Sequence, residues 1–123
     1  MKKPRENPYR GREAVMFGFA CSAEEDGEYF FYVRIPGDIG VRERGDRFED
    51  PLRIALDKAG IGRVAGGGSQ LGEGTRIEFC GVDVFTTDRK AGLRFLKQQL
   101  RSLGAPSGTV IEEYLPSRTD HPI

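Results

Sequence analysis

The chain is 123 residues long, of which 37% are hydrophobic and 31% are charged. A domain of this length buries roughly two-thirds of the surface of its unfolded chain, so it needs no disulfide or metal to fold. Its 19 Lys and Arg residues balance 19 Asp and Glu residues. This balance excludes an overall charge that would direct the protein to nucleic acid or to an acidic membrane. Electrostatic recognition must therefore come from local segregation of charge.

The pattern along the chain predicts one domain between two loose ends. Two prolines and five basic residues precede the first apolar run, and the last residues are mostly polar. Chain ends of this composition are commonly poorly ordered. The predicted parts are a flexible basic arm over residues 1–12, a single α+β domain over residues 13–115 and a C-terminal tail over residues 116–123.

Two strands are predicted at the start of the domain, over residues 13–21 and 28–35. Val15, Phe17 and Phe19 alternate along the first, and the second is rich in aromatic and β-branched residues. Both features favour strands over helices. A polar acidic turn separates the two segments.

Two helices are predicted from apolar side chains at three- and four-residue spacing. The first begins at Asp50 and stops at Gly60, and the second follows Asp88 and stops at Gly104. Further strands are predicted over residues 61–66, 75–85 and 109–115. In the second of these, Ile77 and Phe79 have the opposite phase to Val82 and Val84. A β-bulge at Gly81 would restore one buried face.

From residue 28 onward the predicted order is strand, helix, strand, strand, helix, strand, which is the split βαβ pattern. We therefore expect a ferredoxin-like βαββαβ two-layer sandwich with an additional N-terminal strand and both helices on one face. Phe30 and Tyr32 have the opposite phase to Phe31, so one of these aromatic sets would then face away from the helices. A second copy in a homodimer, or the N-terminal strand, is favoured to cover them over stacked RNA bases.

A glycine-rich segment is the most conspicuous candidate for ligand binding. Successive backbone N–H groups in such a loop can form a nest for an anion. The Lys and the following helix of a phosphate-binding loop are absent, so a mobile hairpin loop is the favoured interpretation. The candidate ligand-binding residues are Gly66, Gly67, Gly68, Ser69 and Gln70.

Two groups of basic residues are candidates for partner binding. One lies in a charged loop over residues 36–47, and the other recurs at helical spacing on the face of the second helix opposite its leucines. Such a face can dock on an acidic partner or a phosphate backbone, although a solvated helix surface is the commoner explanation. The candidates are Arg42, Arg44, Arg47, Lys90, Arg94, Lys97 and Arg101.

Catalysis has little support in the sequence. The one histidine, His121, lies near the end of the chain, and two cysteines with one distant histidine do not make a zinc site. Asp83 and Asp88 leave carboxylate chemistry open, but a turn and a helix cap explain them better. We assign no catalytic residue, no metal and no cofactor.

The favoured function is therefore a non-enzymatic protein-interaction module, with a bacterial immunity or antitoxin-like role as one example. A regulatory domain that binds a small anionic metabolite is the first alternative, and an RNA-binding protein is the second. A protein partner is expected, a homodimer is considered and a membrane is not. Since no leader or bilayer-spanning stretch is visible, the protein is predicted to be cytoplasmic, with both cysteines reduced.

Overall fold

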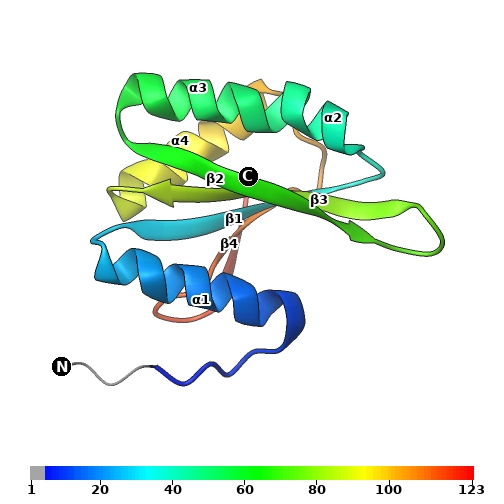
Figure 1. The fold of residues 1–123 in the computed structure, drawn as a ribbon. Helices are drawn as coiled ribbons and strands as arrows, with labels where there is room; N and C mark the ends of the chain where they lie inside the picture. Colours follow the sequence, from blue (N-terminus) through cyan, green and yellow to red (C-terminus); the bar gives the residue numbers. More distant parts are fainter. Residues whose placement is uncertain (1–4) are drawn as a thin grey trace.

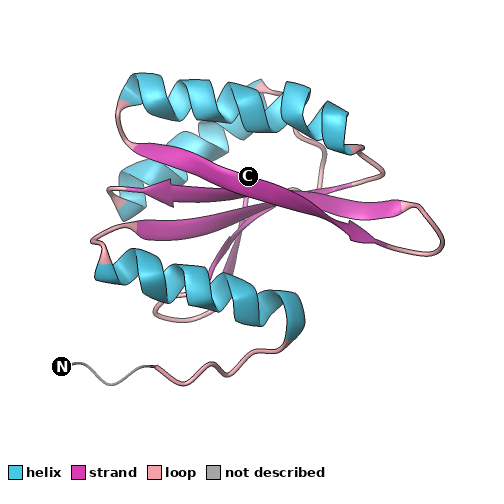
Figure 2. Ribbon diagram, in the orientation of Figure 1, coloured by secondary structure: helices cyan, strands magenta, loops and turns pink. Residues whose placement is uncertain are grey.

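The computed structural model describes residues 5–123 and places a five-stranded antiparallel sheet between helices on its two faces (Figures 1 and 2). Three helices have ten or more residues, and a short helix and one π-helical turn precede the second of them. The elements are α1 (Gly11–Glu25), β1 (Tyr29–Pro36), α2 (Val41–Arg44), η1 (Gly45–Glu49), α3 (Asp50–Ala59), β2 (Gly62–Leu71), β3 (Ile77–Thr86), α4 (Arg89–Ser102), β4 (Val110–Glu113) and β5 (Thr119–Pro122).

The strand order is β2-β3-β1-β4-β5. The fold is thus α+β, as expected, but this order is not that of a standard ferredoxin-like sandwich. One difference is at the C-terminus, where residues 119–122 pair with β4 instead of forming a loose tail. The other is at the N-terminus, where a helix replaces the additional strand.

Helices α3 and α4 cover the same face of the sheet, as predicted (Figure 1). Their apolar stripes meet the inward side chains of β1, β3 and β4 in the larger of two hydrophobic clusters. Gly60 ends α3 in the left-handed conformation, and the Asp88 carboxylate caps α4 by accepting a bond from the Ala91 N–H. Fully buried members of this cluster are Phe31, Val33, Leu52, Leu56, Leu96 and Leu100.

The predicted strand over residues 13–21 is wrong, because this segment lies within α1. The apolar residues of α1 that recur at helical spacing are buried against the sheet, whereas Val15 is 53% exposed. Apolar residues in this segment fit both the two-residue period of a strand and the 3.6-residue period of a helix, and the contacts with the sheet decide between the two. The apolar side chains that α1 contributes to the second cluster are Met16, Phe17, Ala20 and Ala23. The N-terminal segment thus covers Phe30 and Tyr32 as a helix.

The predicted glycine loop is also wrong in its extent. β2 continues to Leu71, so residues 66–70 belong to a strand that pairs with β3. The register shifts twice, between Val64 and Gly66, where β2 has the extra residue, and between Gln70 and Leu71, where β3 has it. β1 and β3 pair without interruption from Tyr29↔Thr86 to Pro36↔Phe79.

No bulge therefore forms at Gly81. A side chain at this position would overlap the hydroxyl and ring of Tyr32. Tyr32 projects from the neighbouring strand and is 4% exposed. Gly81 is a packing site for an aromatic ring of the next strand. The two apolar phases of β3 face opposite sides of the sheet, with Cys80, Val82 and Val84 in the larger cluster and Phe79 packed against the second.

Candidate functional site

The two edges of the sheet differ in length and protection. β5, at one edge, has four residues and carries Asp120 and Pro122. β2, at the other edge, has ten residues, no lysine and no proline, and it pairs only with β3. Lysine, proline and short length are the usual means by which proteins protect an edge strand from pairing with another chain. β2 lacks all three.

The glycines in the middle of β2 let other groups approach its backbone closely. A Cβ atom at residue 67 would lie 2.5 Å from the Gly81 carbonyl oxygen and 3.3 Å from Nε of Arg44. Arg44 projects from α2, and its Nη1 donates a hydrogen bond to Oγ of Ser69 at 3.3 Å. Its Nε lies 3.6 Å from Glu49 but has no hydrogen-bond partner among residues 5–123. Gly67 thus makes room for a buried arginine beside the edge strand.

On the face of the sheet that carries α1, a groove of about 170 Å³ opens between α1 and β2. We call it the β2 groove. Tyr32 and Phe79 contribute aromatic rings, and the guanidinium of Arg12 lies 5.2 Å and 5.3 Å from the centres of these two rings. Its complete lining is Arg12, Met16, Tyr32, Gly67, Gly68, Ser69, Gln70, Phe79 and Asp83. Four of the five residues predicted to bind a ligand therefore line one groove.

Asp83 is the unusual residue of the β2 groove. It lies on β3 opposite Tyr32 on one side and Gly66 on the other. Its Oδ1 is buried and has no hydrogen-bond partner among the described residues. Burial, with the nearby charge of Glu49, raises the pKa of Asp83, and the charge of Arg44 offsets part of this effect. Leaving a buried carboxylate oxygen unpaired costs free energy, so this position calls for a functional explanation.

Arg12 is held in place by a buried glutamate. Its two terminal nitrogens donate hydrogen bonds to the carboxylate of Glu112, at 2.8 and 3.2 Å. Arg118 and the Tyr114 hydroxyl donate to the same carboxylate, and Arg34 lies 3.4 Å from it. The side chain of Glu112 is fully buried, so these donors stabilise a charge that water does not reach.

The Glu112 carboxylate stays ionised in this setting. Burial raises the pKa of Glu112, but the hydrogen bonds from Arg12 and Tyr114 and the arginine charges lower it by more. Burial also raises the pKa of Tyr32 to about 12, so its phenol is neutral. The charge of Arg12 is therefore matched by Glu112, whereas the carboxylate of Asp83 has no such partner.

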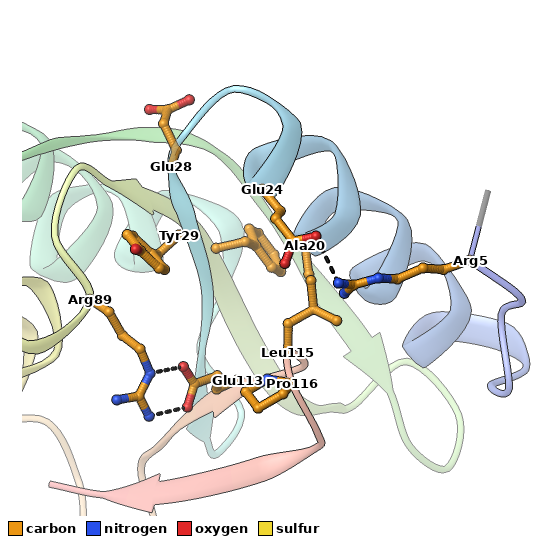
Figure 3. A pocket seen from close by; sticks show the side chains of 10 residues that line it. Arg5, Ala20, Glu24, Glu28, Tyr29, Arg89, Glu113, Leu115 and Pro116 are labelled. Atoms are coloured by element: carbon orange, nitrogen blue, oxygen red, sulfur yellow. Dashed lines mark hydrogen bonds and ion pairs between the residues drawn. The ribbon is translucent and has the colours of Figure 1, made fainter. Parts of the chain in front are cut away.

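A second cavity, of about 180 Å³, lies between α1 and the end of β4 (Figure 3). Its charged groups are paired: Arg89 donates two hydrogen bonds to Glu113, one of them 2.7 Å long, and Arg5 pairs with Glu24. His121 Nε2 lies 3.0 Å from Glu113, which completes the partners of that carboxylate. No unpaired buried polar atom lies in this cavity among the described residues. The β2 groove is therefore the stronger candidate.

The basic residues predicted to bind a partner are placed differently from one another. The segment expected as a charged loop is helical in α2 and η1, where Arg42 is exposed and Arg47 pairs with Glu43. Arg44 is buried, so it is unavailable as a surface contact, and the structure instead brings it to the glycines of β2.

The basic face of α4 is present as predicted by the spacing. Arg101 donates to the Ile123 carbonyl. Within residues 5–123, Lys90, Arg94 and Lys97 form no ion pair, although Lys97 is partly buried. Lys2 and Lys3 of the predicted arm lie outside the described residues, and Arg12 belongs to α1.

The sequence gives little warning of three residues of the β2 groove. The sequence places Arg12 in the arm and Tyr32 under a strand or a second copy, and it favours a turn residue over carboxylate chemistry for Asp83. An aspartate between Val82 and Val84 in a strand was the available signal, because a charge within a buried strand needs a partner.

The described residues contain no cluster of three or more His, Cys, Asp or Glu arranged to hold a metal ion. In the same part of the chain, no helix is long and apolar enough to cross a membrane. Comparison of the chain with protein-family models, with curated proteins and with solved structures found no match. What the site does must therefore be argued from its geometry.

Proposed function

We propose that the protein is a non-enzymatic interaction module that binds an extended segment of a partner protein along the edge of β2. The observation that supports this most directly is the unprotected length of β2. In strand addition, main-chain hydrogen bonds supply affinity and pockets for alternate side chains supply specificity. β2 offers a free backbone edge and has a groove on one of its faces.

The glycines of β2 suit this role. Residues 66–68 carry no side chains that would cover the edge, and Gly67 is exposed. Arg44 on one face and Asp83 on the other each retain a buried polar atom without a partner. Side chains of an added strand point alternately to the two faces, so a donor on the groove side would approach Asp83.

A partner of different sequence fits better than a second copy of β2. Cross-strand contacts between side chains stabilise a pair of strands and fix its register. Two copies of β2 would oppose glycines to glycines and would gain few such contacts. Homodimerisation through β2 is thus one outcome of the test below and is not our proposal.

The anionic-ligand hypothesis loses its geometric basis. A backbone nest needs consecutive N–H groups that converge, whereas those of a strand point alternately to opposite sides. Residues 66–70 are extended within β2. The carboxylate of Asp83 would also oppose an anion in the β2 groove.

For the fold, we propose that β1-α3-β2 and β3-α4-β4 are the interleaved units of a ferredoxin-like core extended by α1 and β5. Two observations support the proposal. β3 lies between β1 and β2 and β1 lies between β3 and β4, and both connecting helices lie on one face.

The strand-addition proposal is tested with a displayed library of random peptides selected on the folded protein. Selected peptides should shift the amide resonances of residues 63–71 in an NMR spectrum. Ala65→Lys places a charge in the middle of β2 at an exposed residue that the register leaves unpaired with β3, and it should weaken binding at least tenfold. Thr119→Lys adds the same charge to exposed β5 and should leave binding unchanged.

Three outcomes would contradict the proposal. They are the absence of any selected peptide, shifts confined to another part of the molecule, and equal effects of the two lysine substitutions. A concentration-dependent dimer that Ala65→Lys dissociates would replace the partner segment with a second copy.

A further inference from the structure

The β2 groove has an acidic group that no residue between 5 and 123 satisfies. Both carboxylate oxygens of Glu112 and of Glu113 have hydrogen-bond partners. Oδ1 of Asp83 has none among the described residues, although this atom is itself buried. Within the described residues, the two buried glutamates are thus paired, whereas one oxygen of the partly buried Asp83 has no partner beside a cavity.

The basic group in the same groove does not supply the missing partner. Arg12 directs its terminal nitrogens to Glu112 and forms no ion pair with Asp83. Arg44 is the other cation close enough to affect the pKa of Asp83. It lies beside Gly67, however, and is paired with Glu49. Within residues 5–123, no cation therefore pairs with Asp83 in the β2 groove.

The size and lining of the β2 groove limit what that group can be. Sites for drug-sized molecules enclose about 300–1,000 Å³, so about 170 Å³ holds a smaller group. Tyr32 and Phe79 present aromatic rings there, and the Arg12 guanidinium already lies over both, so their remaining surface suits an aliphatic stem. Gln70 adds a polar side chain at the strand, whereas the Ser69 hydroxyl is paired with Arg44. A short aliphatic chain that ends in a cation matches both the space and the chemistry.

We propose that the β2 groove binds an ammonium or guanidinium group on a short aliphatic stem, with the cation paired to the carboxylate of Asp83. This goes beyond strand addition, because the site would bind such a group whether or not a strand pairs with β2. The stem lies along Tyr32 and Phe79, and the cation lies at the glycines. A lysine or arginine side chain of a partner and a free small amine both carry this group.

The test uses the isotopically labelled full chain and three probes. They are n-butylammonium, the neutral n-butanol, and N-acetyl-lysine-methylamide as a lysine within a peptide. The ammonium probes should shift the amide resonances of Gly67 and Gly68 in a saturable manner, and n-butanol should not. Asp83→Asn should weaken the binding of the ammonium probes at least tenfold. Asp57→Asn, on the exposed side of α3, should leave it unchanged.

The relative affinities of the ammonium probes identify the carrier. Tighter binding of the lysine derivative indicates a peptide side chain, and equal or tighter binding of n-butylammonium indicates a free amine; both support the site. A carbon-detected pH titration of the Asp83 carboxyl gives a second measurement on the unsubstituted protein. Saturating n-butylammonium should lower its pKa, because a paired cation favours the ionised form.

The proposal is overturned if n-butanol produces the same shifts, if no probe shifts these amides, or if the Asp83 titration is unchanged by n-butylammonium. None of these outcomes bears on strand addition, which the Ala65→Lys comparison tests separately. Conversely, if Ala65→Lys does not weaken peptide binding, strand addition is contradicted, but the result of the amine titrations is unaffected.

Discussion

The ring of Tyr32 occupies the space that a side chain at residue 81 would fill. The two residues lie on neighbouring strands, β1 and β3, and Tyr32 is buried between the sheet and α1. This contact fixes the floor of the β2 groove, because Tyr32 lines it together with Phe79 and Asp83.

Gly81→Ala should destabilise the protein by roughly 1–3 kcal/mol, since the added methyl group forces a buried ring to move. The measurement is urea unfolding of the variant and the unsubstituted chain. Tyr32→Leu removes the ring, so adding Gly81→Ala to it should cost much less. Equal costs in the two backgrounds would show that the two residues do not compete for space.

A pair of neighbouring glycines provides a matched test of the packing at β2. A Cβ atom at residue 67 would meet the Gly81 carbonyl and Arg44, whereas one at residue 68 would meet nothing within 4 Å. Gly67→Ala should lower the free energy of unfolding by roughly 1–3 kcal/mol. Gly68→Ala should change it little or raise it by about 0.5–1 kcal/mol, because glycine weakens a strand. The reverse order in thermal melts would contradict this placement of the strand.

Glu112→Gln should destabilise the protein by about 2–4 kcal/mol, because Arg12, Arg34 and Arg118 would lose the carboxylate that neutralises them. Chemical denaturation measures the loss. Asp120→Asn, which removes an exposed partner of Arg118, should cost less than about 1 kcal/mol and serves as the control. Similar losses in both variants would remove the distinction between the buried and exposed partners.

Acid should unfold the protein through Glu112 and Glu113. For both, burial raises the pKa, but hydrogen bonds and the charges of their partners lower it by more. A carboxylate whose pKa is lowered in the folded state stabilises the protein at every pH above its ordinary pKa of 4.5. This stability is lost as the pH falls through the lowered pKa of the folded state. The free energy of unfolding, measured from pH 7 downward, should therefore decrease below about pH 4.5, and less steeply in Glu112→Gln.

Asp83 should show the opposite linkage. Its pKa is raised in the folded state, chiefly by burial, so its ionised form opposes folding at neutral pH. Asp83→Asn should therefore increase the free energy of unfolding at pH 7, and the gain should shrink as the pH falls through the raised pKa. A decrease at pH 7 would indicate that the carboxylate has a partner within the folded chain.

The sequence predicts the parts of the fold in which a single periodicity is present. In α4, leucines at three- and four-residue spacing, a capping aspartate and a terminal Gly104 all indicate the same helix, and the structure confirms it. The strands at residues 28–35 and 109–115 follow from alternating or β-branched residues and are confirmed as β1 and β4. Their neighbours in the sheet could not be read from such local patterns.

The errors occur where local patterns conflict or where glycine removes them. Residues 13–21 satisfy both a strand and a helix pattern, and only contact with Phe30 and Tyr32 selects the helix. Residues 66–68 have no side chains from which a strand could be predicted, yet their backbone pairs with β3. That an oxygen of Asp83 is buried without a hydrogen-bond partner can be seen only in the folded structure.

The unequal edges of the sheet also limit how large any assembly can grow. Strands that add at both sides of a sheet propagate into fibrils, because each new member exposes another end. Here the short β5, with Asp120 and Pro122, terminates one side. A segment bound at β2 would therefore give a complex of fixed stoichiometry, one segment per chain, that does not polymerise.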